Sequence, residues 1–276
     1  MRKSRLVATL AVLAAGFTLA AVVPQAGAVV PRAGATTRSL SSTGTPYVNV
    51  MPLGDSITWG YTVKYGKPVV VDGYRKDLWV RLRNVGMNVN FVGSCPRPSW
   101  DRWKCNGGGT MGDNNHEGHS GYRIDQLSAN VGRWAATYQP QIVLLMAGTN
   151  DIAQNYDLRR APARLSTMID RIRAVRPTAH IFVATIPQFR DPARKSTVDA
   201  YNNAIPGVVK SKDSRVHLVP QHLVGTQAKD FSDHVHPSDC GYAKLSFVWY
   251  YTMERHLARS DWPTGYYPWN NTGVCA

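Results

Sequence analysis

At 276 residues the chain has room for one full-sized domain with a large hydrophobic core. It carries 32 Lys and Arg residues against 18 Asp and Glu, which gives a formal net charge of +14. The Arg residues are scattered through predicted helices and form no basic arm or stripe, which argues against nucleic acid as a partner. Solubility outside the cell accounts for this charge, and its positive field would also favour acidic polymers or anionic surfaces at long range.

Residues 1–28 predict a secretory signal peptide. A cationic stretch at residues 1–5 precedes an apolar run over residues 6–23, and Ala26-Gly27-Ala28 supplies the small residues that a signal peptidase needs. A membrane anchor is the alternative, because an apolar run of about 18 residues is near the lower limit for a spanning helix. The flanks and the Ala-rich end favour cleavage after Ala28, with Ala35 as the second choice. We therefore expect a secreted, extracellular protein with no stable membrane anchor after cleavage.

The remaining chain divides into a flexible linker (residues 29–45, rich in Ser, Thr, Gly and Ala), a domain (residues 46–260) and a C-terminal tail (residues 261–276). Within the domain, short apolar runs alternate with amphipathic stretches. The predicted strands lie at residues 47–51, 89–92, 142–146, 181–186 and 216–219. The predicted helices lie at residues 73–84, 124–138, 162–175, 197–210 and 241–259. Strands alternating with helices predict a doubly wound, flavodoxin-like α/β domain, a three-layer sandwich around a mostly parallel five-stranded sheet.

Polar motifs follow the first, third and fifth predicted strands. They contain Ser56 in Gly54-Asp55-Ser56, Asn150 in Gly148-Thr149-Asn150-Asp151, and Asp233 with His236. Parallel strands end at the same edge of a sheet, so we expect these residues to meet there. A serine needs an imidazole to take its proton and a carboxylate to hold that imidazole, and His236 and Asp233, three residues apart, supply both. The pattern predicts nucleophilic acyl transfer.

Two nearby features have simpler interpretations. His234 lies beside Asp233 but lacks the three-residue spacing, and it is interpreted as a rim residue. His116-Glu117-Gly118-His119 looks superficially like a metalloprotease helix, but two ligands on one helical face must be four residues apart. No metal site and no cofactor are predicted.

The four cysteines, an even number in an exported chain, predict disulfides, and four cysteines allow three connectivities. We favour Cys95 with Cys105, which brackets a short loop, and Cys240 with Cys275, which would attach the tail to the catalytic region. A zinc site is the alternative, but no Cys-x-x-Cys or Cys/His spacing supports it.

In their order along the chain, these motifs resemble the blocks of the SGNH (GDSL-type) hydrolase superfamily, with Glu117-Gly118-His119-Ser120-Gly121 as the second block. The resemblance spans residues 48 to about 257 and implies the SGNH hydrolase fold. It also implies a catalytic triad of Ser56, His236 and Asp233, and an oxyanion hole formed by the backbone N–H groups of Ser56 and Gly118 and the side-chain amide of Asn150. Asp55 is expected to orient the Ser56 loop by accepting backbone hydrogen bonds.

Within the superfamily, residues 51–60, 117–125 and 148–152 resemble secreted carbohydrate esterases of the acetylxylan esterase kind, in carbohydrate esterase family 3. The resemblance implies a carboxylic ester hydrolase, expected as a monomer, that removes acetyl groups from plant polysaccharide through an acyl-enzyme intermediate. A loop at residues 93–112 follows the family pattern poorly and would wall the cleft. A secreted lipase, lysophospholipase or general short-chain esterase is the alternative, although no extended apolar lid is evident. A non-catalytic carbohydrate-binding module is the alternative from another class.

Overall fold

A parallel sheet lies at the centre of the computed structural model, which describes residues 46–96, 111–257 and 275. The chain divides into two units, Met1–Thr43 and Gly44–Ala276, and every described residue lies in the second. The sheet order is β4-β1-β6-β7-β8, with β5 also paired to β1, and every pairing in this sheet is parallel. The strands are β1 (Val48–Gly54), β4 (Val89–Phe91), β5 (Glu117–Gly118), β6 (Ile142–Met146), β7 (His180–Ala184) and β8 (Val216–Val219).

The two central strands are buried along almost their whole length. All five residues of β6 are buried, as are the last five of β1. Leu53 pairs with Leu145 and Gly54 with Met146, so the two strands end together. A strand covered on both faces needs a continuous apolar run, which is the pattern that made these strands recognisable in the sequence.

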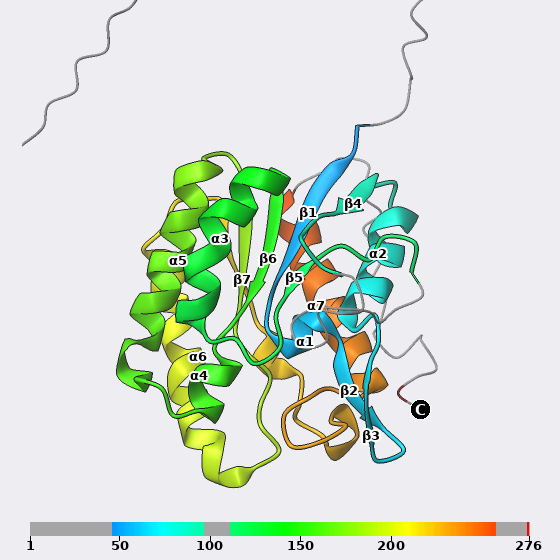
Figure 1. The fold of residues 1–276 in the computed structure, drawn as a ribbon, viewed down its shortest axis with the longest axis vertical. Helices are drawn as coiled ribbons and strands as arrows, with labels where there is room; N and C mark the ends of the chain where they lie inside the picture. Colours follow the sequence, from blue (N-terminus) through cyan, green and yellow to red (C-terminus); the bar gives the residue numbers. More distant parts are fainter. Residues whose placement is uncertain (1–45, 97–110, 258–274, 276) are drawn as a thin grey trace, which may run out of the picture. The chain divides into compact units, whose positions relative to one another are not determined.

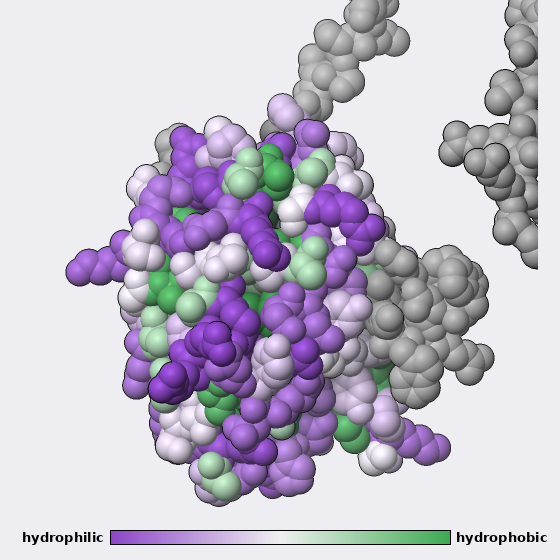
Figure 2. Space-filling view, turned by 60° about the vertical axis from the view of Figure 1, so that its left-hand side comes forward, coloured by the Kyte–Doolittle hydropathy of each residue, from purple (hydrophilic) through white to green (hydrophobic). Residues whose placement is uncertain are grey.

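Helices cover the sheet on both faces (Figure 1). The helices α3 (Ile124–Tyr138), α5 (Ala161–Val175) and α6 (Lys195–Lys210) pack side by side on one face. The helices α2 (Tyr74–Asn84) and α7 (Asp239–Leu257) pack together on the other. In α5, Leu165, Met168, Ile169 and Ile172 are buried at helical spacing. Figure 2 brings the α3 and α5 side forward, where hydrophilic residues dominate and hydrophobic ones are scattered among them. The predicted three-layer α/β fold is confirmed.

Several short elements were not predicted. The sheet has a sixth strand, β5, which pairs with β1 beyond the end of β4. It was not predicted because a strand of two residues is too short to show a periodic pattern. The short helices α1 (Ser56–Trp59) and α4 (Thr149–Ala153) escaped prediction for the same reason. The hairpin of β2 (Tyr61–Lys64) and β3 (Lys67–Val70) turns at Tyr65 and Gly66, both in the left-handed region with φ of 53° and 73°. Such paired positive φ angles are typical of a two-residue hairpin turn.

A disulfide joins Cys240, near the start of α7, to Cys275, the pairing that the sequence favoured. Cys95 is also disulfide-bonded, whereas Cys105 lies outside the described residues. The predicted signal peptide, the linker and most of the loop at residues 93–112 lie outside them too. Among the helices of the described part, none is both long enough and apolar enough to cross a membrane.

Candidate active site

A sharp strand-to-helix turn places Ser56 at the carboxyl end of β1. Asp55 caps α1, and its Oδ1 accepts the Ile57 N–H at 3.0 Å, as expected for a carboxylate that orients this turn. Gly54 has no space for a side chain, since a Cβ there would lie 2.3 Å from the Met146 carbonyl oxygen of β6. The turn therefore packs directly against the central strand, and Ser56 starts the helix beyond it.

Ser56, His236 and Asp233 are joined by two hydrogen bonds. Ser56 Oγ lies 2.8 Å from His236 Nε2, and His236 Nδ1 lies 2.8 Å from Asp233 Oδ2. The other carboxylate oxygen of Asp233 accepts the backbone N–H groups of Val235 at 2.8 Å and His236 at 2.7 Å. The sequence predicted that these three residues would meet, although Ser56 and His236 are 180 positions apart.

The electrostatics keep Asp233 ionised. Burial alone would raise its pKa, but the hydrogen bonds from the His236 ring and from two backbone N–H groups outweigh burial and lower the pKa to about 2. An ionised Asp233 accepts a hydrogen bond from the Nδ1–H group of His236, so the neutral imidazole has its lone pair on Nε2, facing the Ser56 hydroxyl. The arrangement can therefore take a proton from Ser56.

The β2–β3 hairpin supports residues 233–237, the segment that carries His236 and is called the histidine segment below. The Tyr61 ring packs against the His236 ring with centroids 4.3 Å apart. Thr62, which is almost fully buried, donates its hydroxyl to the Pro237 carbonyl at 2.9 Å, and the Tyr242 hydroxyl donates to the Tyr61 carbonyl at 2.6 Å. Sequence reasoning missed this contribution, because an antiparallel hairpin outside the main sheet has no fixed place in the strand–helix alternation.

The turn at residues 119–122, directly after β5, links the end of β1 to α4. The His119 N–H donates to the Gly54 carbonyl at 2.9 Å, which ties the start of this turn to the end of β1. At the other end, the Asn150 side-chain amide donates one hydrogen to the Tyr122 carbonyl at 3.0 Å. The turn is thus held between the Ser56 loop and Asn150, and the amide of Asn150 keeps its second N–H hydrogen for another acceptor.

Gly118 does not fit the predicted role of an oxyanion donor. Its N–H donates to His116 Nδ1 at 2.9 Å, and burial, followed by the charges of Arg75 and His119, holds the pKa of His116 well below its usual value, so the ring stays a neutral acceptor. Gly118 is a glycine because a Cβ would lie 2.4 Å from the Trp59 nitrogen. In the turn that follows β5, the N–H of Gly121 has no hydrogen-bond partner among the residues that the structure describes.

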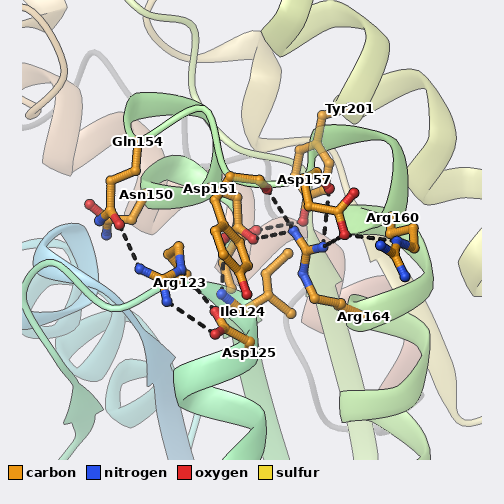
Figure 3. Close-up of polar contacts among 12 residues, drawn as sticks. Arg123, Ile124, Asp125, Asn150, Asp151, Gln154, Asp157, Arg160, Arg164 and Tyr201 are labelled. Atoms are coloured by element: carbon orange, nitrogen blue, oxygen red, sulfur yellow. Dashed lines mark hydrogen bonds and ion pairs between the residues drawn. The ribbon is translucent and has the colours of Figure 1, made fainter.

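Gln154, directly after α4, and Arg123, directly before α3, support this turn, and Figure 3 shows the contact between these two side chains. Gln154 donates its amide to the Gly121 carbonyl at 3.1 Å, and Arg123 donates to the Gln154 side-chain oxygen at 2.7 Å. Arg123 also pairs with Asp125 at 3.0 Å and lies over the Tyr156 ring. These contacts give Arg123 a supporting role next to the turn.

Asp151, directly after Asn150, anchors two helices to the site. The buried carboxylate accepts the Ile124 N–H of α3 at 2.9 Å and the Arg164 guanidinium of α5 at 2.7 Å, as Figure 3 shows. Burial raises its pKa despite the hydrogen bonds that oppose the rise. Asp151 therefore fixes the start of α4, and with it the position of Asn150.

One cluster has the residue types of a metal site. The ligand atoms of Cys95, Glu117 and His119 all lie within 4.8 Å of one another. Cys95 is disulfide-bonded and offers no thiolate, while Glu117 accepts the Ser94 N–H at 2.7 Å and lies 2.8 Å from His119 Nε2. Hydrogen bonds within the protein explain this cluster, and it does not fit the donor set of a zinc site.

Comparisons with known proteins found a matching family model and two related sequences. The model of the GDSL-like lipase/acylhydrolase family matches residues 53–244. A multidomain esterase of Ruminococcus flavefaciens is 32% identical over 246 residues, which cover 82% of this chain and 31% of that protein. Putative endoglucanase X of Acetivibrio thermocellus is 31% identical over 149 residues, 51% of this chain and 63% of that protein. The chain thus spans less than two thirds of either relative.

Two solved structures share both the fold and part of the sequence. A family 3 carbohydrate esterase from Clostridium thermocellum is 32% identical with a TM-score of 0.62, covering 78% of this chain and 100% of that one. A family 3 carbohydrate esterase from Talaromyces cellulolyticus is 26% identical with a TM-score of 0.62, covering 75% of this chain and 97% of that one.

Proposed function

Because the chain belongs to the GDSL-like lipase/acylhydrolase family and is a carboxylic ester hydrolase, we propose that it cleaves acetyl esters of plant polysaccharide, such as acetylxylan, at Ser56. The observation that carries the catalytic part is the pair of 2.8 Å hydrogen bonds from Ser56 through His236 to Asp233. The substrate part rests on the similarity to family 3 carbohydrate esterases, one of which is 32% identical to this chain.

The reaction proceeds in two steps. His236 Nε2 takes the proton of Ser56 as Oγ attacks the ester carbonyl, and ionised Asp233 stabilises the imidazolium. The imidazolium then gives this proton to the leaving sugar oxygen, and the acetyl group stays on Ser56. Water, deprotonated by His236, then attacks the acetyl carbonyl. The bond between Ser56 Oγ and the acyl carbon breaks, the imidazolium returns the proton to Oγ, and acetate leaves with the serine and the histidine restored.

Three N–H donors stabilise the oxyanion of each tetrahedral intermediate in this proposal. They are the backbone N–H groups of Ser56 and Gly121 and the side-chain amide of Asn150. Gly121 replaces Gly118 because the N–H of Gly118 is already donated to His116, whereas that of Gly121 is free of partners within the described part of the chain. A fixed donor aimed at the developing charge is worth about 3 kcal/mol of barrier.

The protein is also proposed to be secreted, with residues 1–28 removed as a signal peptide and residues 46–260 forming the catalytic domain. The mass of the secreted protein would locate the cleavage site, for which Ala28 is the expected last residue of the signal.

Acetate release from acetylated xylan by the purified protein tests the substrate, with long-chain esters as the comparison. Rapid acetate release that disappears in Ser56→Ala supports the proposal. Dominant cleavage of long-chain esters would favour a lipase instead. Binding to xylan without hydrolysis, unchanged in Ser56→Ala, would favour a carbohydrate-binding module.

A further inference from the structure

A cavity of about 630 Å³ opens beside the histidine segment. Ala153, the last residue of the helix that carries Asn150, lines one part of it. His234 and Val235, directly before His236, line another. An acetyl group needs only a small part of this space, which falls within the range of roughly 300–1,000 Å³ typical of sites for whole small molecules. The cavity therefore has room for a sugar unit, and its described lining includes chain neighbours of the proposed catalytic groups rather than those groups themselves.

Two arginines line this cavity. The Arg190 backbone N–H donates to the His234 carbonyl at 2.9 Å, which fixes the loop of Arg190 against the histidine segment. Arg194 donates one guanidinium N–H to the Ile152 carbonyl at 3.2 Å and keeps the others. Within the described ranges neither guanidinium has a carboxylate partner, in contrast to the arginines that support α3 and α5.

The other lining groups leave the cavity with an excess of positive charge. Asp191 is the acidic residue among the described lining residues, and its Oδ1 already accepts the Ala193 N–H at 2.9 Å. Phe189 and Pro192 add apolar surface. A combination of apolar walls and two unpaired guanidinium groups suits a sugar that presents C–H surface and carries a carboxylate, because guanidinium binds carboxylate through paired N–H donors.

We propose that Arg190 and Arg194 bind the carboxylate of a uronic acid near the acetylated sugar, so that the protein prefers acetyl esters on acidic polysaccharide. This inference rests on the proposed function and narrows its substrate class. Removal of residues 1–28 takes away Arg2, Lys3 and Arg5, and the remaining formal charge of +11 (14 − 3) acts in the same direction, because it raises the local concentration of an acidic polymer.

The test compares two acetylated xylo-oligosaccharides that differ only in a glucuronic acid branch. At low ionic strength the wild type should show a kcat/KM at least about tenfold higher for the acidic one, through a lower KM, and added salt should reduce this ratio. Arg190→Gln and Arg194→Gln should each lower the ratio at least about threefold. Arg194→Lys, which keeps the charge, should retain part of it. Arg159→Gln removes one exposed charge that does not line the cavity, and it should leave the ratio unchanged.

Equal kcat/KM values for the two oligosaccharides would overturn the inference, and so would a ratio that both Gln variants preserve. Neither result contradicts the proposed function, which requires only that acetate is released. If the wild type hydrolysed neither oligosaccharide, the proposed function itself would be refuted.

Discussion

Asp55 connects the site to the stability of the fold. Its side chain is fully buried directly before Ser56, and burial raises its pKa from 3.8 to about 6, although the hydrogen bond from the Ile57 N–H opposes the rise. The folded protein therefore binds this proton more tightly than the unfolded chain does. The stability contributed by protonated Asp55 is present below about pH 4 and is lost as the pH rises to about 6.

The magnitude follows from the two pKa values. A difference of about 2 corresponds to about 3 kcal/mol of unfolding free energy once both states are ionised. Asp55→Asn retains a side-chain oxygen that can cap α1 but removes the ionisation. The unfolding free energy of the variant minus that of the wild type should therefore rise by about 3 kcal/mol as the pH rises from about 4 to about 7.5.

Urea denaturation of both proteins at the two pH values measures this gain. Asp233→Asn is the matched control, because the hydrogen bonds that outweigh burial lower the pKa of Asp233 to about 2. The stability contributed by ionised Asp233 is complete above about pH 4 and is lost as the pH falls toward 2. The difference in unfolding free energy between this control and the wild type should therefore not rise comparably between about pH 4 and about pH 7.5. An equal stability difference between wild type and Asp55→Asn at both pH values would refute the reasoning.

The remaining predictions concern individual groups of the site. Ser56→Ala and His236→Ala should each lower kcat by more than about 10⁴-fold with an unchanged circular dichroism spectrum, and appreciable turnover by His236→Ala would overturn the assignment of the base. In steady-state assays of acetate release, Asn150→Ala should lower kcat by about 100-fold or more and leave KM nearly unchanged. Gln154→Ala, which frees the Gly121 carbonyl, should lower kcat by a smaller factor, whereas an effect on KM alone would contradict a role in positioning the oxyanion donors. Arg75→Met removes a buried guanidinium that donates to three carbonyl groups, and we expect a loss of about 3 kcal/mol in urea denaturation.

Some features of this protein could be predicted from the sequence because their causes are local. Residues 142–146 form a strand, and residues 124–138 a helix, with the boundaries that the apolar patterns predicted. Strand–helix alternation then implied a parallel sheet, whose carboxyl edge brings together motifs far apart in the chain. The meeting of Ser56 with His236 follows from that rule.

The tertiary structure decided features whose causes lie elsewhere in the chain. The N–H of Gly118 is occupied because His116 turns toward it, and the β2–β3 hairpin supports His236 through contacts between residues 175 positions apart. The raised pKa of Asp55 arises from burial among several elements. Residue types and spacing determine which groups are able to react. Hydrogen-bond availability, burial and charge depend on neighbours that only the folded chain brings together, and these properties decide which of those groups face a substrate.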